Sequence, residues 1–244
     1  MNIEIIKLTP DLAEDYVRFF DMTPHWDDIA EHKCYCVCWA SADHNAEIKE
    51  DGSTASGRRE IAKRYVKEGY IQGYLAYCGG NIVGWCNANA KSDCLRSYSW
   101  EHFMQSVDAT PADNVKSVFC FVIAPDMQRK GLATRLLQRV CDDAAEDGFD
   151  YVEAYPKKEF ANIADDFMGP AEMYRKHGFV EVANCGDMAV MRKMGGKLQR
   201  RKKLQLGMET VNFLVLLAFV RAGLGVESRW GSRAGSRWGA RWAF

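Results

Sequence analysis

A chain of 244 residues is near the upper size of one α/β domain and short for two, which predicts one main domain with an appendage. Its hydrophobic share of 48% and charged share of 27% exclude a disordered or collagen-like protein. Residues 195–244 hold ten basic and two acidic residues, a charge of +8, which leaves 22 basic and 31 acidic residues, or −9, in residues 1–194. We therefore predict two regions, with a boundary after residue 194.

Nine cysteines form an odd set without regular spacing, and the opening residues Met1–Glu4 carry no export signal. We therefore expect free thiols in a cytoplasmic protein. The longest apolar run, Val211–Val220, contains Asn212 and is about half as long as a helix that spans a bilayer. No membrane span is expected.

The first half of the chain predicts one strand and two helices. Residues 3–8 alternate as a strand does, and a helix with an aromatic stripe follows and stops before Pro24. A second helix is expected at residues 57–69, where Ser56 can cap its start. Residues 24–55 are rich in Cys, Trp and His and poor in regular pattern, which indicates the lining of a pocket rather than a linker.

The next stretch predicts strands. Residues 74–78 and 82–86 form a hairpin around Gly79-Gly80, because both turn positions need a positive φ. Residues 90–114 are polar and without period, so an irregular excursion is expected there. Val115–Ile123 is an almost continuous apolar run, which is typical of a central strand buried on both faces.

The last elements of the domain alternate between helix and strand. They are predicted as a helix at 134–147, a strand at 151–155, a short helix at 171–177 and two closing strands at 179–183 and 188–192. This order indicates an α/β protein with helices flanking a sheet.

The turn after the central strand carries the clearest chemical signal. It reads Gln128-x-x-Gly131-x-Ala133 and opens a helix. The first N–H groups of a helix lack partners and hold positive partial charge, so the amides at 129–134 can surround a pyrophosphate. Small residues at 131 and 133 let the backbone approach it. The turn is not a P-loop, because no Gly-Lys-Ser/Thr closes it.

This strand, the turn, its helix, a further strand and then Met173-Tyr174-Arg175-Lys176-His177-Gly178-Phe179 resemble the GNAT superfamily of acetyl-CoA-dependent N-acetyltransferases. The resemblance implies a central mixed sheet and acetyl-CoA as cosubstrate. It implies that the central strand splays from its neighbour and pairs with the pantetheine arm, while the turn binds the pyrophosphate. The implied cofactor-binding residues are Phe121, Val122, Ile123, Gln128, Arg129, Lys130, Gly131, Leu132, Ala133 and Thr134.

The resemblance also implies catalytic residues. Tyr174 holds the place of the phenol that protonates the departing thiolate, although a packed aromatic is the alternative. Many members have an Asn seven residues earlier, where this chain has Phe167. Glu153, on the strand after the helix, is either a general base acting through water or an ion-paired strand residue, and the sequence favours neither.

The segment rich in Cys, Trp and His suggests an acceptor site. Carboxylates and aromatic faces attract cationic amines, although paired acids more often begin a helix. The candidates are Trp26, Asp27, Asp28 and Trp39.

A metal site is a weaker hypothesis for the neighbouring residues His32, Cys34, Cys36 and Cys38. Alternate residues on a strand lie about 6.5–7 Å apart, whereas thiolates on one zinc need about 3.8 Å. Only a coiled segment could close such a site. Free buried cysteines, or a thiol lining the acceptor pocket, are favoured instead, and no metal is predicted.

The tail repeats a Ser-Arg-Trp-Gly unit after residue 227. Arg and Trp could bind an anionic membrane or nucleic acid, but a four-residue repeat fits no stable fold. We favour a disordered or non-native extension and expect no nucleic-acid partner.

Together these features predict direct transfer of an acetyl group, in a ternary complex, to a primary amine of a small molecule or a protein. A homodimer is compatible with this prediction. The alternative is a non-catalytic module that binds acyl-CoA and regulates a partner.

Overall fold

The computed structural model describes residues 2–40, 51–107, 114–159, 161, 167–196 and 208. The chain divides into two units, Met1–Arg200 and Arg201–Phe244. Within the tail predicted at 195–244, only residues 195, 196 and 208 are described, so its repeats lie outside the described residues.

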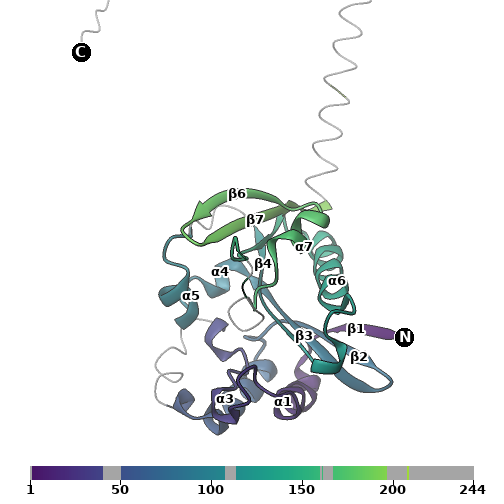
Figure 1. Ribbon diagram of the computed structural model, residues 1–244, viewed down its shortest axis with the longest axis vertical. Helices are drawn as coiled ribbons and strands as arrows, with labels where there is room; N and C mark the ends of the chain where they lie inside the picture. Colours follow the sequence, from purple (N-terminus) through teal and green to yellow (C-terminus); the bar gives the residue numbers. More distant parts are fainter. Residues whose placement is uncertain are drawn as a thin grey trace, which may run out of the picture. The chain divides into compact units, whose positions relative to one another are not determined.

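The first unit is built on a mixed sheet of seven strands in the order β1-β2-β3-β4-β5-β7-β6 (Figure 1). Every neighbouring pair is antiparallel except β4 and β5, which are parallel. This arrangement confirms the predicted fold class. The strands are β1 Ile3–Lys7, β2 Gly73–Cys78, β3 Asn81–Ala90, β4 Val115–Ile123, β5 Tyr151–Ala154, β6 Val180–Cys185 and β7 Met188–Met194.

The described α-helices are α1 Ala13–Met22, α3 Ala55–Lys67, α4 Lys91–Cys94, α5 Tyr98–Phe103, α6 Leu132–Asp147 and α7 Ala171–Lys176. Short α4 and α5 occupy part of the stretch that was predicted to be irregular. Helix α3 begins earlier than predicted, because Thr54 rather than Ser56 caps it and accepts a hydrogen bond from the Gly57 N–H at 3.0 Å. None of the helices in the described parts of the chain is long and apolar enough to cross a membrane.

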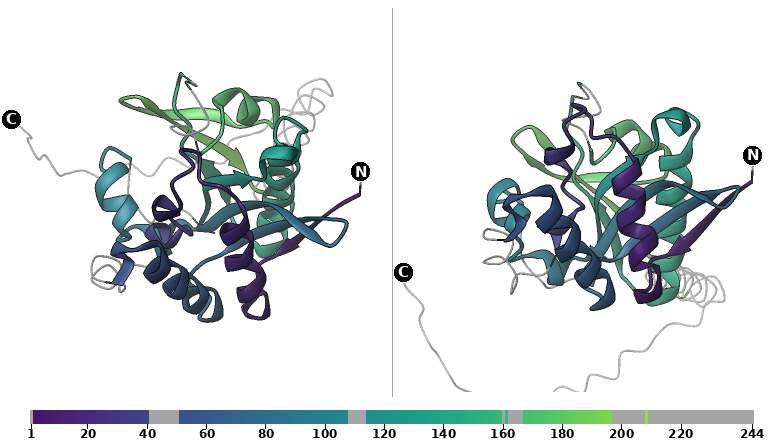
Figure 2. Two further views of the ribbon diagram at one scale, coloured as in Figure 1. Left: turned by 60° about the horizontal axis from the view of Figure 1, so that its bottom comes forward. Right: turned by 90° about the horizontal axis from the view of Figure 1, so that it is seen from below.

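Alternating side chains of the strands pack in hydrophobic clusters on both faces of the sheet. Tyr74 and Ala76 of β2 pack in one cluster with the apolar stripe of α6. Leu75 of β2 and Trp85 of β3 pack in a second cluster with α1 and α3. Figure 2 shows α1 and α3 on the opposite side of the sheet from α6.

A β-bulge interrupts β4 at Phe119. On one side of it Ala88 of β3 pairs with Val118, and on the other side Asn87 pairs with Cys120, so Phe119 is an extra residue. An extra residue bends its strand and increases the local twist. The bulge therefore changes the direction of the second half of β4.

The parallel pairing between β4 and β5 stops at this bulge. Its last pair is Val118 with Ala154, and the rest of β4 continues without β5. The Phe119 ring stacks on Trp39, with centroids 4.6 Å apart, and on Tyr155, with centroids 5.7 Å apart. This buried aromatic stack holds the bulge, and the two strands diverge beyond it.

Candidate active site

A cavity of about 650 Å³ lies beside the free half of β4. Its wall includes every predicted cofactor-binding residue except Lys130. The opposite wall comes from the end of α1 and the segment that follows it, with Phe20, Thr23, Pro24, His25, Trp26, Lys33 and Cys34. A third stretch of wall is formed by residues of 167–173. The cavity therefore brings together parts of the chain that are about a hundred residues apart.

The turn before α6 has the geometry of an anion cradle. Arg129 and Gly131 both have left-handed backbones, with φ of 58° and 78°. A Cβ placed on Gly131 would meet nothing within 4 Å, so the space in front of this backbone is open. The helix begins at Leu132, and its first amides have no partners inside the helix. This turn can bind a phosphate group through backbone N–H groups and the helix dipole.

The free half of β4 offers fewer open backbone groups than predicted. The Phe121 N–H donates to the Phe167 carbonyl oxygen at 2.8 Å. The Ile123 carbonyl accepts from Nε2 of Gln128 at 3.2 Å. Because backbone direction alternates along a strand, Val122 turns its polar groups toward β3, and the structure places it in the cavity wall. The backbone groups that this edge can still offer are therefore those of Phe121 and Ile123 that these two bonds do not use.

Tyr174 lies in α7 with its side chain fully buried. Its hydroxyl donates to the Met168 carbonyl oxygen at 2.5 Å, and its ring packs on Phe179 at a centroid distance of 5.3 Å. Burial raises the pKa of Tyr174 well above its ordinary value, so the phenol keeps its proton. The neighbouring Met173 belongs to the described cavity wall, but Tyr174 itself does not.

Glu153 lies on β5, is fully buried and has partners at both oxygens. Oε1 accepts from Lys91 Nζ at 2.8 Å and from the Tyr155 hydroxyl at 2.8 Å. Oε2 accepts from Arg192, at 2.8 Å from Nε and 2.7 Å from Nη2. A general base needs a free oxygen facing its substrate, and Glu153 lies outside the described cavity wall. Of its two interpretations, the structure therefore favours the ion-paired strand residue over the general base.

The two tryptophans proposed for the acceptor site have different surroundings. Trp26 is 65% exposed and lines the cavity, as an aromatic contact for an acceptor should. Trp39 is buried against Phe119 and supports the bulge of β4 instead.

The paired acids after Trp26 do not begin an α-helix. Asp28 is exposed, with a left-handed backbone at φ 58°. Asp27 accepts from Nδ1 of His25 at 2.5 Å and from Nδ1 of His32 at 2.6 Å. The turn at Asp28 brings the two histidines to the same carboxylate. The sequence shows His25 and Asp27 two residues apart, and this spacing was the only signal for the cluster.

The cysteine cluster does not form a metal site with His32. All nine cysteines are free thiols. In the described chain, the one group of three potential ligands that comes together is His25, Asp27 and His32. Burial raises the pKa of the Cys38 thiol to about 12, so this thiol is protonated at neutral pH. Cys34 lines the cavity, as the alternative interpretation of these cysteines expected.

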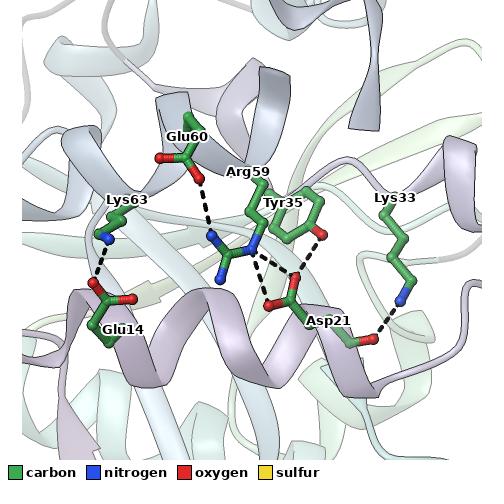
Figure 3. Close-up of polar contacts among 7 residues, drawn as sticks. All are labelled: Glu14, Asp21, Lys33, Tyr35, Arg59, Glu60 and Lys63. Atoms are coloured by element: carbon green, nitrogen blue, oxygen red, sulfur yellow. Dashed lines mark hydrogen bonds and ion pairs between the residues drawn. The ribbon is translucent and has the colours of Figure 1, made fainter. Parts of the chain in front are cut away.

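A network of polar contacts holds the segment after α1 in place (Figure 3). The Asp21 carboxylate accepts from Nε of Arg59 on α3 at 3.0 Å and from the Tyr35 hydroxyl at 2.9 Å. Nζ of Lys33 donates to the Asp21 backbone oxygen at 2.7 Å. In addition, Arg58 Nε donates to the Lys33 carbonyl at 2.8 Å. These bonds fix the cavity wall to the ends of two helices.

A mixed sheet that opens between two parallel strands, with an anion cradle at the following helix, defines an acyl-CoA-dependent transferase of the kind that the sequence resembles. Residues 9–179 match the acetyltransferase (GNAT) family. The chain belongs to this family and is an acetyltransferase that uses acetyl-CoA. Among proteins with curated descriptions, none matches the chain.

Several solved structures resemble the fold at low sequence identity. A GNAT acetyltransferase from Streptococcus pneumoniae is 17% identical, with 80% of this chain and 100% of that chain covered and a TM-score of 0.44. The PaiA N-acetyltransferase from Thermoplasma acidophilum, in complex with coenzyme A, is 14% identical, with coverage of 80% and 99% and a TM-score of 0.45. Mutant forms of the spermidine/spermine N-acetyltransferase SpeG from Vibrio cholerae are 14% identical, with coverage of 82% and 99% and a TM-score of 0.45.

Proposed function

We propose that this acetyltransferase moves the acetyl group of acetyl-CoA directly to a primary amine of a small molecule or a protein. One observation carries the proposal: a single cavity joins the anion cradle before α6, the free half of β4 and a separate wall after α1. Such a cavity can hold donor and acceptor at the same time, so the transfer requires no covalent acetyl-enzyme intermediate. Nine free thiols also support a reducing, cytoplasmic location.

The residues of the cradle fit the pyrophosphate of acetyl-CoA. Amides at residues 129–134 supply donors, and the exposed Arg129 and Lys130 side chains supply positive charge at the opening. The open space in front of Gly131 admits the phosphates against the backbone. From there the pantetheine arm would run along the free half of β4 toward Phe121, which also lines the cavity.

The reaction needs a neutral amine, a stabilised oxyanion and a protonated leaving group. The Phe121 N–H on the free half of β4, once it releases the Phe167 carbonyl, is the proposed donor to the oxyanion of the thioester carbonyl. Tyr174 is the proposed proton donor to the departing sulfur, since its phenol carries a proton and its neighbour Met173 lines the cavity. For this role the Tyr174 hydroxyl must break its hydrogen bond to the Met168 carbonyl and donate to the sulfur instead.

Acetyl-CoA-dependent release of free thiol, measured with a panel of primary amines, tests this function. A small diamine, an aminoglycoside, an amino acid and a lysine peptide represent the main acceptor classes, and mass spectrometry identifies the acetylated product. Thiol release that requires one amine class supports direct transfer and identifies the acceptor. A protein that binds acetyl-CoA and releases thiol with none of them would contradict the proposal.

A further inference from the structure

The segment after α1 carries a hydrogen-bonded cluster of two histidines around one carboxylate. Asp27 accepts from His25 Nδ1 at 2.5 Å and from His32 Nδ1 at 2.6 Å, and its Oδ1 also accepts from the Ile29 N–H at 3.0 Å. The two imidazole rings are nearly perpendicular, with centroids 5.9 Å apart. The Asp27 side chain is 15% exposed and that of His25 is 20% exposed. The cluster is therefore ordered by its own bonds, with Asp27 and His25 partly shielded from water and His32 exposed.

The carboxylate determines which nitrogen of each histidine is basic. Burial alone would raise the Asp27 pKa, but the hydrogen bonds from His25 and His32 outweigh it and hold this pKa well below its usual range. An ionised carboxylate only accepts hydrogen bonds, so each Nδ1 must carry a proton. The free Nε2 of each ring is then the proton acceptor.

The distances favour a proton relay over a metal site. Two ligands of a tetrahedral zinc, with bonds near 2.1 Å, lie about 3.4 Å apart. The Asp27 oxygens lie 2.5 Å and 2.6 Å from the two ring nitrogens, which are short hydrogen bonds and well below the separation of two ligands on one zinc. A metal between these atoms would require all three side chains to separate.

His25 is the member of the cluster that lines the cavity. It lines the same cavity as Cys120 and Phe121 of β4, whereas His32 lies outside the described lining and its side chain is 55% exposed. A pantetheine arm that ran back along β4 from a pyrophosphate at the start of α6 would bring the thioester toward Phe121. The stretch of wall after α1 would then be left for the acceptor, and it contains His25 and Trp26.

We propose that His25 is the general base of the acetyl transfer and that Asp27 is its positioning residue. This inference rests on the proposed function. Nε2 of His25 takes one proton from the acceptor ammonium, and the freed lone pair of the nitrogen forms the C–N bond. The C–S bond breaks, the sulfur leaves with its electron pair, and the second nitrogen proton replaces the one that Tyr174 gives to the sulfur. The proton on His25 then passes to solvent, so the net products are an amide, free CoA and one proton.

Other charged or titratable groups border the same cavity and can affect the pH dependence. On the described walls they are Lys33 and Cys34 after α1, Cys120 on β4 and Arg129 before α6. Nζ of Lys33 is engaged by the Asp21 backbone oxygen. Within the described residues, no other group than Asp27 bonds to the imidazole of His25, which leaves Nε2 open to the acceptor.

The test compares His25→Gln and Asp27→Asn with a control, His102→Gln, whose imidazole is exposed and bonds to the Tyr98 carbonyl. Acetyl-CoA affinity, measured by calorimetry, reports folding and the donor site and is expected to stay within about twofold in all three. We expect kcat/KM for the amine to fall by about 10²–10⁴ in His25→Gln, the range for a positioned base. The acid-side decline of kcat/KM, which protonation of the base causes, should disappear.

Asp27→Asn should lower kcat/KM less than His25→Gln does and should shift the acid-side decline of kcat/KM to another pH. In a further variant, His25→Ala, added free imidazole should restore part of the activity. Unchanged kcat/KM and pH profile in His25→Gln would overturn the inference while leaving the proposed function intact. Wild-type activity that EDTA abolishes and Zn²⁺ restores would overturn it in favour of a metal site. A wild-type protein that acetylates no amine would overturn both proposals.

Discussion

The Phe121 N–H donates to the Phe167 carbonyl oxygen across the gap where β4 leaves β5, at 2.8 Å. The next residue, Met168, accepts from the buried Tyr174 hydroxyl on the other side of that gap. Residues 167 and 168 are therefore tied to β4 and to α7 at once. One N–H donates to one acceptor at a time, so a pantetheine carbonyl that pairs with Phe121 must displace Phe167.

This relationship predicts a conformational step during binding. The rate of acetyl-CoA association, followed by stopped-flow fluorescence, should reach a limit at high concentration, because residues 167–168 must first release the gap. Tyr174→Phe removes one of the two ties, which is worth about 1 kcal/mol, and should raise that limit about fivefold. A rate that rises linearly with concentration in both proteins would contradict the displacement of Phe167.

The same variant tests the proton donor. Tyr174→Phe removes only the hydroxyl, so the ring contact with Phe179 stays and the dissociation constant of acetyl-CoA should not rise, while loss of the bond to Met168 can lower it by up to about fivefold. Turnover should fall by about 10²–10⁴ if the phenol protonates the departing thiolate. Steady-state kinetics and calorimetry separate the two effects. Equal losses of binding and turnover would assign Tyr174 a packing role.

The anion cradle can be tested with a matched pair of glycines. Gly131 and Gly178 have φ of 78° and 79°, and a Cβ on either would meet nothing within 4 Å. Replacing either with Ala should therefore cost a similar ~1–2 kcal/mol of backbone strain. Only Gly131 lines the cavity, so Gly131→Ala alone should weaken acetyl-CoA binding, by about tenfold or more. Thermal shifts with and without acetyl-CoA measure both quantities, and equal loss of affinity in the two variants would contradict the cradle.

The buried charges around Glu153 predict a large effect on stability. Glu153→Gln leaves Lys91 and Arg192 without their anion, and breaking such a buried pair costs about 3–5 kcal/mol. Urea unfolding should show this loss, whereas kcat of the folded fraction should remain close to that of the wild type. A stable variant with greatly reduced turnover would restore the general-base interpretation.

Lys116 predicts a pH dependence of stability. Burial lowers its pKa, and its Nζ has the Gln72 side-chain oxygen at 3.5 Å as a weak partner. Between the folded and unfolded pKa values the unfolded chain binds more protons, so the free energy of unfolding rises with pH through this range. Lys116→Met should stabilise the protein at neutral pH by about 0.5–2 kcal/mol and flatten that rise. Lys176→Met, at an exposed position, is the control and should change neither.

The central strand and the turn after it could be predicted because their signals are local. The apolar run of β4 and the spacing of Gln128, Gly131 and Ala133 depend on neighbours in sequence. The bulge at Phe119 could not be predicted, because it exists only relative to the register of β3. Glu153 could not be assigned either, since its partners Lys91 and Arg192 lie 62 and 39 residues away.

The histidine cluster depends on a backbone turn that the sequence did not predict. The weaker metal hypothesis grouped His32 with the nearby cysteines, because these residues would share one face of an extended segment. The left-handed turn at Asp28 instead reverses the chain, and His32 meets Asp27 and His25. The pair Asp27-Asp28 does not by itself indicate that the second residue has a left-handed backbone. Such a cluster needs coordinates to be found.

Two of the three stretches of chain that line the cavity are residues 20–34 and residues 120–134. The first is fastened by Asp21, Arg58 and Arg59, and none of these lies in the stretch that carries the anion cradle. Mutations that reshape the first wall can therefore accumulate without disturbing the donor half of the site. This modularity gives natural selection, or a directed-evolution experiment, a route to new acceptors from an unchanged acetyl donor.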